Sequence, residues 1–267
     1  LIGGLAGDAI TTGTYNTALG YTALGANTTA TNSVAVGAFA LGVNTTGEAN
    51  TAVGLAALDA NTTGQQNVAV GRDALGTNVA GSFQTAVGYN ALATANYTTN
   101  IYAYNTAVGW YAGNSTTTGK ITAVGASTLQ SNTTGINNVA MGGATDAAGA
   151  ALQNNTTGGH NTAFGNVCLR SNTTASFNTA VGYSSLATST TAGSNSAFGY
   201  ASLALATSGG NNSAFGAQAL YANTTGHSNN SFGLQSLDAN TEGTYNCAFG
   251  HVALTANITG SGNSAFG

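Results

Sequence analysis

The most regular chemical feature of the sequence is an asparagine followed two residues later by a threonine. This N-x-T pattern is the acceptor for N-linked sugars in secreted proteins, so its asparagines are candidate glycosylation sites. The alternative is structural, because asparagine tolerates left-handed turns and its amide can stack from repeat to repeat. A stacked amide cannot also carry a sugar, and we favour the stack. The candidates share one place in a repeat and are Asn27, Asn44, Asn61, Asn132, Asn172, Asn223 and Asn257.

Aromatic residues gather around one longer repeat unit and form a second candidate site. Rings with polar tips suit the recognition of sugars or proteins, and loops that leave a rigid scaffold commonly carry function. Local packing of the rings over an enlarged turn is the alternative, and we give it more weight. The candidate ligand-binding residues are Tyr97, Tyr102, Tyr104, Trp110 and Tyr111.

Groups that could catalyse a reaction or hold a metal are sparse. The seven acidic residues and three histidines are scattered along the chain, and no spacing matches a zinc site, a phosphate loop or a nucleophile elbow. Two cysteines, Cys168 and Cys247, lie about five repeats apart, too far for a disulfide, and each replaces a small residue. We therefore expect no enzymatic activity, no metal and no cofactor.

The composition excludes several classes of protein. Only 4% of the residues are charged, against about 25% in a typical globular protein. Three basic residues cannot neutralise a nucleic-acid backbone. No apolar run approaches the roughly 20 residues of a membrane-spanning helix. Because 42% of the residues are hydrophobic, the chain is also unlike a disordered protein.

The candidate residues belong to a tandem repeat, and its period governs the fold. Each unit closes in a sequence such as TAVG, whose glycine we take as position 0. Twelve of the fifteen intervals between these glycines are 17 residues, one is 16, and longer units occupy 89–109 and 143–165. The array fills residues 1–267 as one domain. Both ends lie in the repeat register, so we expect a segment of a longer fibre. The glycines are Gly3, Gly20, Gly37, Gly54, Gly71, Gly88, Gly109, Gly125, Gly142, Gly165, Gly182, Gly199, Gly216, Gly233, Gly250 and Gly267.

The pattern within a unit predicts an all-β parallel β-solenoid of about 15 coils. Position −2 is usually Ala, −1 is a large apolar residue, +4 is usually Leu, and Asn and Gly recur at +7 and +10. Two apolar places separated by a glycine do not make an amphipathic helix, whereas two short strands joined by two turns fit. Stacked coils would rise roughly 70 Å at about 4.8 Å per coil.

Positions −2 and −1 must point to opposite faces of their strand. We favour Ala in the thin coil interior, which leaves a ladder of Val and Phe on the outside as an interface. In the alternative, the large side chains point inward and no partner is needed. Either arrangement leads us to expect a buried ring at Phe215.

The repeat resembles a known family of bacterial surface proteins. NSVAVG at 32–37 resembles the head repeat of trimeric autotransporter adhesins, although the period of that repeat is shorter than 17. TAVGYNAL at 85–92 and NTTG between units resemble repeats of phage tail fibres and related surface fibres. The resemblance implies a left-handed, trimeric β-roll outside the cell, at the cell surface or on a virion.

Together these observations predict a structural module of an extracellular fibre or surface adhesin, with a rigid and neutral polar surface. Its expected partners are copies of itself, as a trimer or an end-to-end fibre, and carbohydrate, either attached or bound. A phage tail-fibre shaft is the alternative. Ice binding is a weaker third hypothesis, suggested by the threonines at +8 and +9, which point to opposite faces and so give each face only one threonine per coil.

Overall fold

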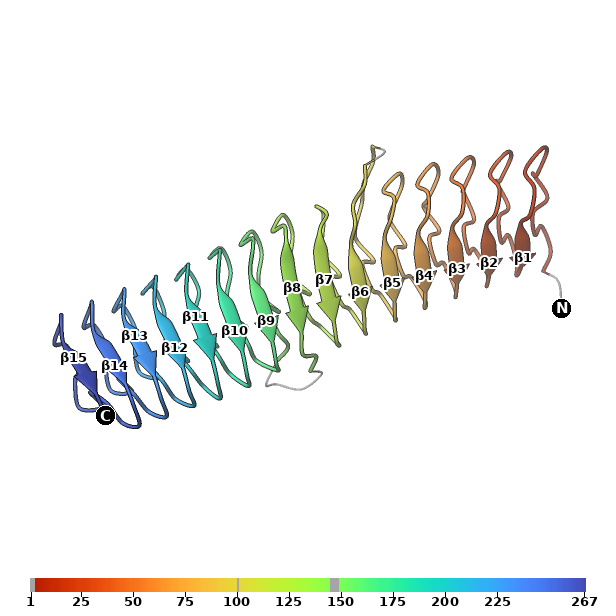
Figure 1. Ribbon diagram of the computed structural model, residues 1–267. Coiled ribbons are helices and arrows are strands. Elements are labelled where there is room, and N and C mark those ends of the chain that lie inside the picture. Colours follow the sequence, from red (N-terminus) through yellow and green to blue (C-terminus); the bar gives the residue numbers. More distant parts are fainter. Residues whose placement is uncertain (1–2, 100, 145–148) are drawn as a thin grey trace. The chain divides into compact units, whose positions relative to one another are not determined.

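The computed structural model describes residues 3–99, 101–144 and 149–267. The chain forms two compact units, Leu1–Thr134 and Gly135–Gly267, and each is a stack of similar coils (Figure 1). Strands and turns make up the described residues, and no helix occurs among them. Part of the longer repeat unit predicted at 143–165, residues 145–148, lies outside the described residues.

The strands of the first unit lie side by side in chain order, and each pairs with the next in parallel. Register is kept across the longer unit, because Thr85 pairs with Thr106 although 21 residues separate them. The strands are β1 (Thr17–Leu19), β2 (Val34–Val36), β3 (Thr51–Val53), β4 (Val68–Val70), β5 (Thr85–Val87), β6 (Thr106–Val108) and β7 (Ile121–Val124).

The second unit repeats this parallel, in-register arrangement. Val139 pairs with Thr162, so the register also survives the 23-residue interval. Its strands are β8 (Asn138–Met141), β9 (Thr162–Phe164), β10 (Thr179–Val181), β11 (Ser196–Phe198), β12 (Ser213–Phe215), β13 (Asn230–Phe232), β14 (Cys247–Phe249) and β15 (Ser264–Phe266). The prediction of an all-β parallel solenoid with a 17-residue repeat is confirmed. That the array over 1–267 is a single domain stays a prediction.

Each coil holds one short strand, so the prediction of two strands per coil was wrong. The rest of the coil is a series of turns built around residues with positive φ. In the coil that contains Gly54, these are Ala49 at −5, Ala56 at +2 and Leu58 at +4, with φ of 55°, 54° and 52°. Left-handed residues interrupt an extended backbone, which explains why no second strand forms. Coil-to-coil hydrogen bonds nevertheless continue through the turns, as from Leu58 N to Ala74 O at 3.0 Å.

The glycine at position 0 is required by its backbone and by its neighbour. Gly54 has a φ of 137°, a conformation that other residues reach only with strain. A β-carbon on Gly54 would also lie 2.6 Å from the carbonyl oxygen of Gly71 in the next coil. Both requirements follow from the close stacking of equivalent turns.

The coil interior is filled by small and medium side chains. Ala at −2 and Leu at +4 are fully buried in most coils, as Ala52 and Leu58 illustrate. Position −1 points outward, where Val53 and Phe215 are half-buried. The predicted inward Ala and outward Val/Phe ladder are therefore confirmed. In the single chain the Phe215 ring is half-buried, because the strand places −1 on the opposite face from the interior, so the expected burial of this ring against a partner copy stays a prediction.

Candidate functional site

The asparagines at +7 form a buried ladder inside the stack. Asn61 Nδ2 donates to the carbonyl of Gly64 at 3.0 Å and to Asn44 Oδ1 in the preceding coil at 2.9 Å. Asn78 Nδ2 donates in the same way to Asn61 Oδ1, at 3.0 Å. Each amide therefore closes its own turn and joins it to a neighbouring coil, which is the stacking arrangement expected from the sequence.

All seven candidate glycosylation residues occupy this +7 position, where Ala95, Thr116, Ser189 and Ala206 interrupt the runs of asparagine. Six of the seven candidates are fully buried and Asn257 is half-buried. Even Asn257 Nδ2 donates to Gly260 O and Asn240 Oδ1, both at 3.0 Å. An N-linked sugar is joined to the side-chain nitrogen of asparagine. The turn would therefore have to open before a sugar could be attached there. Glycosylation stays a prediction, and the geometry weighs against it.

A second amide ladder, at position −4, was missed from the sequence. Asn50 Nδ2 donates to Gly64 O at 2.8 Å, and the backbone N–H of Asn67 donates to Asn50 Oδ1 at 3.0 Å. Gly64 O also accepts from Asn61, so the two ladders meet at this carbonyl. The signal was the first letter of NTAVG, which is Asn in most units and is replaced by Ser33, Gln84 and Ile121 in three of them.

The five predicted ligand-binding aromatics separate into three environments. Tyr97 is 4% exposed, and its hydroxyl accepts a hydrogen bond from Asn105 Nδ2 at 2.7 Å. Burial raises the pKa of Tyr97 to about 12, against a smaller opposing effect of the Asn105 bond. Tyr97 is therefore part of the core, as the packing alternative predicted.

Tyr102 and Tyr104 belong to an exposed cluster completed by Phe83, which sequence reasoning did not identify. The Phe83 ring lies 5.0 Å from Tyr102 in an edge-to-face contact and 5.6 Å from Tyr104 in a stacked one. Tyr102 and Tyr104 are 62% and 54% exposed. Phe83 and Tyr104 share position −5 of consecutive coils, and the signal for Phe83 was this equivalence. We call these three residues the Phe83 cluster.

Trp110 and Tyr111 lie in another cluster, which follows strand β6. Their rings are 4.4 Å apart and edge-to-face, and Tyr111 lies 5.6 Å from Tyr89 in the preceding coil. The Arg72 guanidinium is 5.7 Å from the centre of the Tyr89 ring and forms an ion pair with Asp73 at 3.0 Å. We call Tyr89, Trp110 and Tyr111 the Trp110 cluster.

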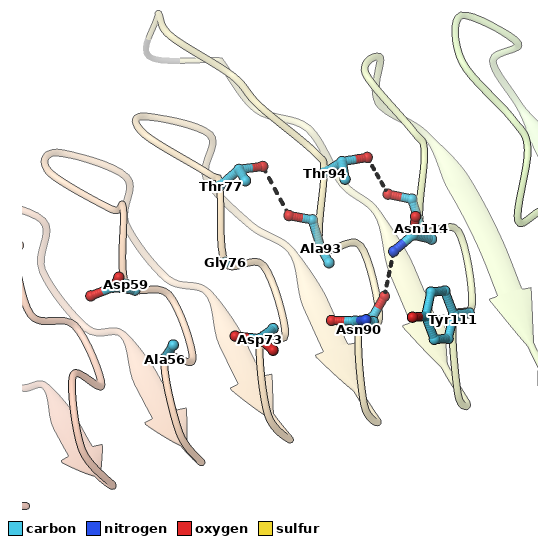
Figure 2. A pocket seen from close by; sticks show the side chains of 10 residues that line it. All are labelled: Ala56, Asp59, Asp73, Gly76, Thr77, Asn90, Ala93, Thr94, Tyr111 and Asn114. Carbon is cyan, nitrogen blue, oxygen red and sulfur yellow. Dashed lines mark hydrogen bonds between the residues drawn. The ribbon is translucent and has the colours of Figure 1, made fainter.

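An open groove of about 460 Å³ runs along the turns that follow β3 to β6, beside this cluster (Figure 2). Its lining comes from positions +2, +5 and +6 of four successive coils. Thr77 and Thr94 donate their hydroxyls to the carbonyls of Ala93 and Asn114, at 2.9 and 2.7 Å, which fixes one wall. We call it the Tyr111 groove; it is lined by Ala56, Asp59, Asp73, Gly76, Thr77, Asn90, Ala93, Thr94, Tyr111 and Asn114.

Two carboxylates give the groove a negative character. Burial raises the pKa of Asp59, and the neighbouring Asp73 carboxylate raises it further. Across the described ranges, no three His, Cys, Asp or Glu side chains come together as a metal site would require. The groove can therefore accept hydrogen bonds and offer a ring face, whereas we find no nucleophile and base paired beside it. The expectation of no enzymatic activity stays a prediction.

The two cysteines are free thiols. Burial raises the pKa of Cys168 to about 11, and its thiol donates to the carbonyls of Phe164 and Gly182. Cys247 is half-buried at position −3 of the outward strand face. Their places in the coil agree with the interpretation of both as replacements for small residues.

The part of the chain that the structure describes has no helix with the length and apolar character needed to cross a membrane. No protein-family model matches the sequence, and neither a curated protein nor a solved structure shows significant similarity to it. The resemblance to adhesin heads and tail-fibre repeats therefore stays a prediction, whereas the parallel strand pairing shows the solenoid itself.

Proposed function

We propose that the chain is a structural, non-enzymatic module of an extracellular fibre or bacterial surface adhesin. The carrying observation is that strand pairs and the two amide ladders join successive coils in register within each unit. Because each coil contacts only its neighbours, adding units extends such a stack without changing its cross-section. A chain with 4% charged residues gives this stack a neutral polar surface.

The proposed partners are copies of the chain itself, assembled as a trimer or as an end-to-end fibre. The outward ladder at −1 supports association, because a continuous apolar stripe commonly marks an interface. In the second unit, the Phe198, Phe215 and Phe232 rings stack at 4.7 and 4.8 Å with interplanar angles of 8° and 3°. Such a regular stripe suits an identical surface on another copy.

A phage tail-fibre shaft is the alternative, and it shares this physical basis. Ice binding is less supported, because the threonine hydroxyls at +8 are used inside the stack. Thr45 Oγ1 donates to Thr62 O at 3.1 Å, and Thr224 Oγ1 donates to Thr241 O at 3.1 Å. A measurement of thermal hysteresis tests that hypothesis directly, and we expect none.

Immunogold electron microscopy tests the proposed location. Antibodies raised against the purified chain are applied to the unpermeabilised cells or particles that produce it. We expect label on external fibres, and label on virion tails would favour the tail-fibre alternative. Label found only inside permeabilised cells would contradict both.

A further inference from the structure

Grooves recur at one place in the coil, and this place carries no assigned role. The Tyr111 groove lies at positions +2, +5 and +6 in the first unit. A groove of about 250 Å³ occupies the equivalent positions in the second unit, after β10 to β12, where Ser184, Gln218 and Tyr221 line it. The turn geometry thus produces a channel along the stack wherever the side chains at +2 and +5 leave space.

Aromatic rings accompany both grooves. Tyr111 lines the first groove and is supported by Trp110 and Tyr89. Tyr200 lines the second and stacks on Tyr183, with ring centres 5.9 Å apart and planes 8° from parallel. An aromatic face beside polar groups suits a ligand that has both a C–H face and hydroxyl groups.

The polar groups of the Tyr111 groove are available for a ligand. The Asn90 side chain and the Asp59 carboxylate make no hydrogen bond to any of the described residues. Asn114 Nδ2 donates to Asn90 O at 3.1 Å, which orients its amide along the groove. Half-buried acceptors without partners gain from a ligand that brings hydroxyl donors.

We propose that the Tyr111 groove binds a neutral oligosaccharide that lies along the stack of coils. Tyr111 receives the C–H face of one sugar ring, while Asp59, Asn90 and Asn114 hydrogen-bond its hydroxyl groups. This binding function goes beyond the structural role proposed above.

The charges of the groove select against other ligand classes. An anionic ligand meets the carboxylates of Asp59 and Asp73, and the nearby Arg72 is already paired with Asp73. A divalent cation prefers six or more oxygen ligands, and two carboxylates with neighbouring amides offer fewer. A neutral polyol uses the carboxylates as hydrogen-bond acceptors without meeting repulsion.

Isothermal titration of the purified chain with neutral tetrasaccharides tests this proposal. The probes are β-linked glucose, β-linked N-acetylglucosamine and α-linked mannose tetramers, with a sulfated tetrasaccharide and Ca²⁺ alone as comparisons. The main variant is Tyr111→Asn, which keeps a residue suited to the left-handed backbone because Asn90 occupies the equivalent position of the preceding coil. Asp59→Asn removes one charge and retains the side-chain shape.

We expect at least one neutral probe to bind. Both Tyr111→Asn and Asp59→Asn should lower the affinity for that probe, and Tyr111→Asn should lower it about tenfold. Asp238→Asn, at position +5 of the second unit, and the double variant Tyr102→Ser/Tyr104→Ser should leave the affinity unchanged. Binding of Ca²⁺ or the sulfated probe in place of neutral sugars would overturn the proposal. So would the absence of any neutral binding, or its loss only in the Tyr102/Tyr104 variant. The structural role has its own test, in which the length of the particle is measured as repeat units are added or removed, so failure of sugar binding leaves that role standing.

Discussion

At the scale of single residues, the buried amides contribute strongly to stability. Replacing Asn61 by Ala removes two donated hydrogen bonds and leaves Asn78 Nδ2 without its Asn61 acceptor. Unsatisfied buried polar groups cost about 1–3 kcal/mol each, so we expect Asn61→Ala to destabilise by about 3 kcal/mol. Thr63→Ala, in the exposed part of the same turn, is the control and should change stability by less than about 0.5 kcal/mol.

Urea denaturation of both variants measures this difference. Equal midpoints for Asn61→Ala and Thr63→Ala would show that the ladder does not stabilise the stack. The same purified protein, produced in a glycosylating host, also decides between the two roles of the N-x-T asparagines. Mass spectrometry should find these residues unmodified in the folded protein.

The buried thiol of Cys168 and the buried phenol of Tyr97 should make the folded protein less stable at alkaline pH. Cys168 and Tyr97 have pKa values of about 11 and about 12, above their ordinary values of 9.0 and 10.0. The folded state therefore binds their protons more tightly than the unfolded state does. The stabilisation of the folded state by these two protonated groups is fully present below pH 9 and is lost as the pH rises toward 12. Thermal melting should be level below about pH 9 and should fall above it.

Cys168→Ala checks the assignment of this pH dependence, because Ala is the residue most common at +3 of the repeat. The variant should lose part of the decline between pH 9 and 11 while it melts normally at pH 7. At pH 8, iodoacetamide should modify Cys247 before Cys168, because Cys168 is buried and its raised pKa disfavours the thiolate that reacts. Faster modification of Cys168 would contradict its burial.

At the scale of the coil, the closing glycine controls how turns stack. Gly54→Ala places a β-carbon against Gly71 O at a φ that disfavours Ala, so we expect a loss of at least about 3 kcal/mol or failure to fold. Gly25→Ala is the matched change, because Gly25 lies at +5, has no positive φ and has Ala at three equivalent positions, 93, 187 and 204, and its β-carbon would lie 3.1 Å from its nearest neighbour, Thr22 O. A chain that tolerates Gly54→Ala as well as Gly25→Ala would contradict the stacking geometry.

The outward ladder gives a prediction that separates folding from association. Phe215 is half-buried in a single chain between Phe198 and Phe232. Phe215→Asp should therefore cost about 1–2 kcal/mol, less than the 3–5 kcal/mol typical of a fully buried Phe. If copies pair through this stripe, sedimentation should show a smaller particle for Phe215→Asp than for the native chain. An unchanged particle mass would remove the ladder as an interface.

The period of the repeat was enough to predict the coil and the direction of its side chains. A fixed spacing places like residues on neighbouring strands, and the interior behind strands such as Thr51–Val53 takes a small side chain, which is Ala in most coils and Ser231 in one. The second strand could not be excluded in advance, because Leu58 gives no sign of its left-handed backbone. Nor could the groove be foreseen, because Asp59 and Tyr111 lie 52 residues apart at variable positions of the repeat.

The aromatic residues show the same limit at the longer unit. Their order along the chain did not reveal that Tyr97 enters the core while Tyr102 and Tyr104 remain exposed. Which of these rings is buried depends on the course of the backbone through the inserted residues. The parallel bridge between Ser82 and Tyr102 joins the end of this segment to the stack again. Only the repeat equivalence of Phe83 and Tyr104 was readable from the sequence alone.

For the whole molecule, the central claim is that length follows the number of units. Stability should be a sum of terms from single coils and from their contacts, so units can be inserted or deleted within one stack. The measurement is particle length by electron microscopy for chains with three 17-residue units added after Gly216 or removed from the same region. We predict steps of about 14 Å per three units, at about 4.8 Å per coil, with an unchanged diameter. A particle whose length does not change with unit number, or whose diameter grows instead, would contradict the account.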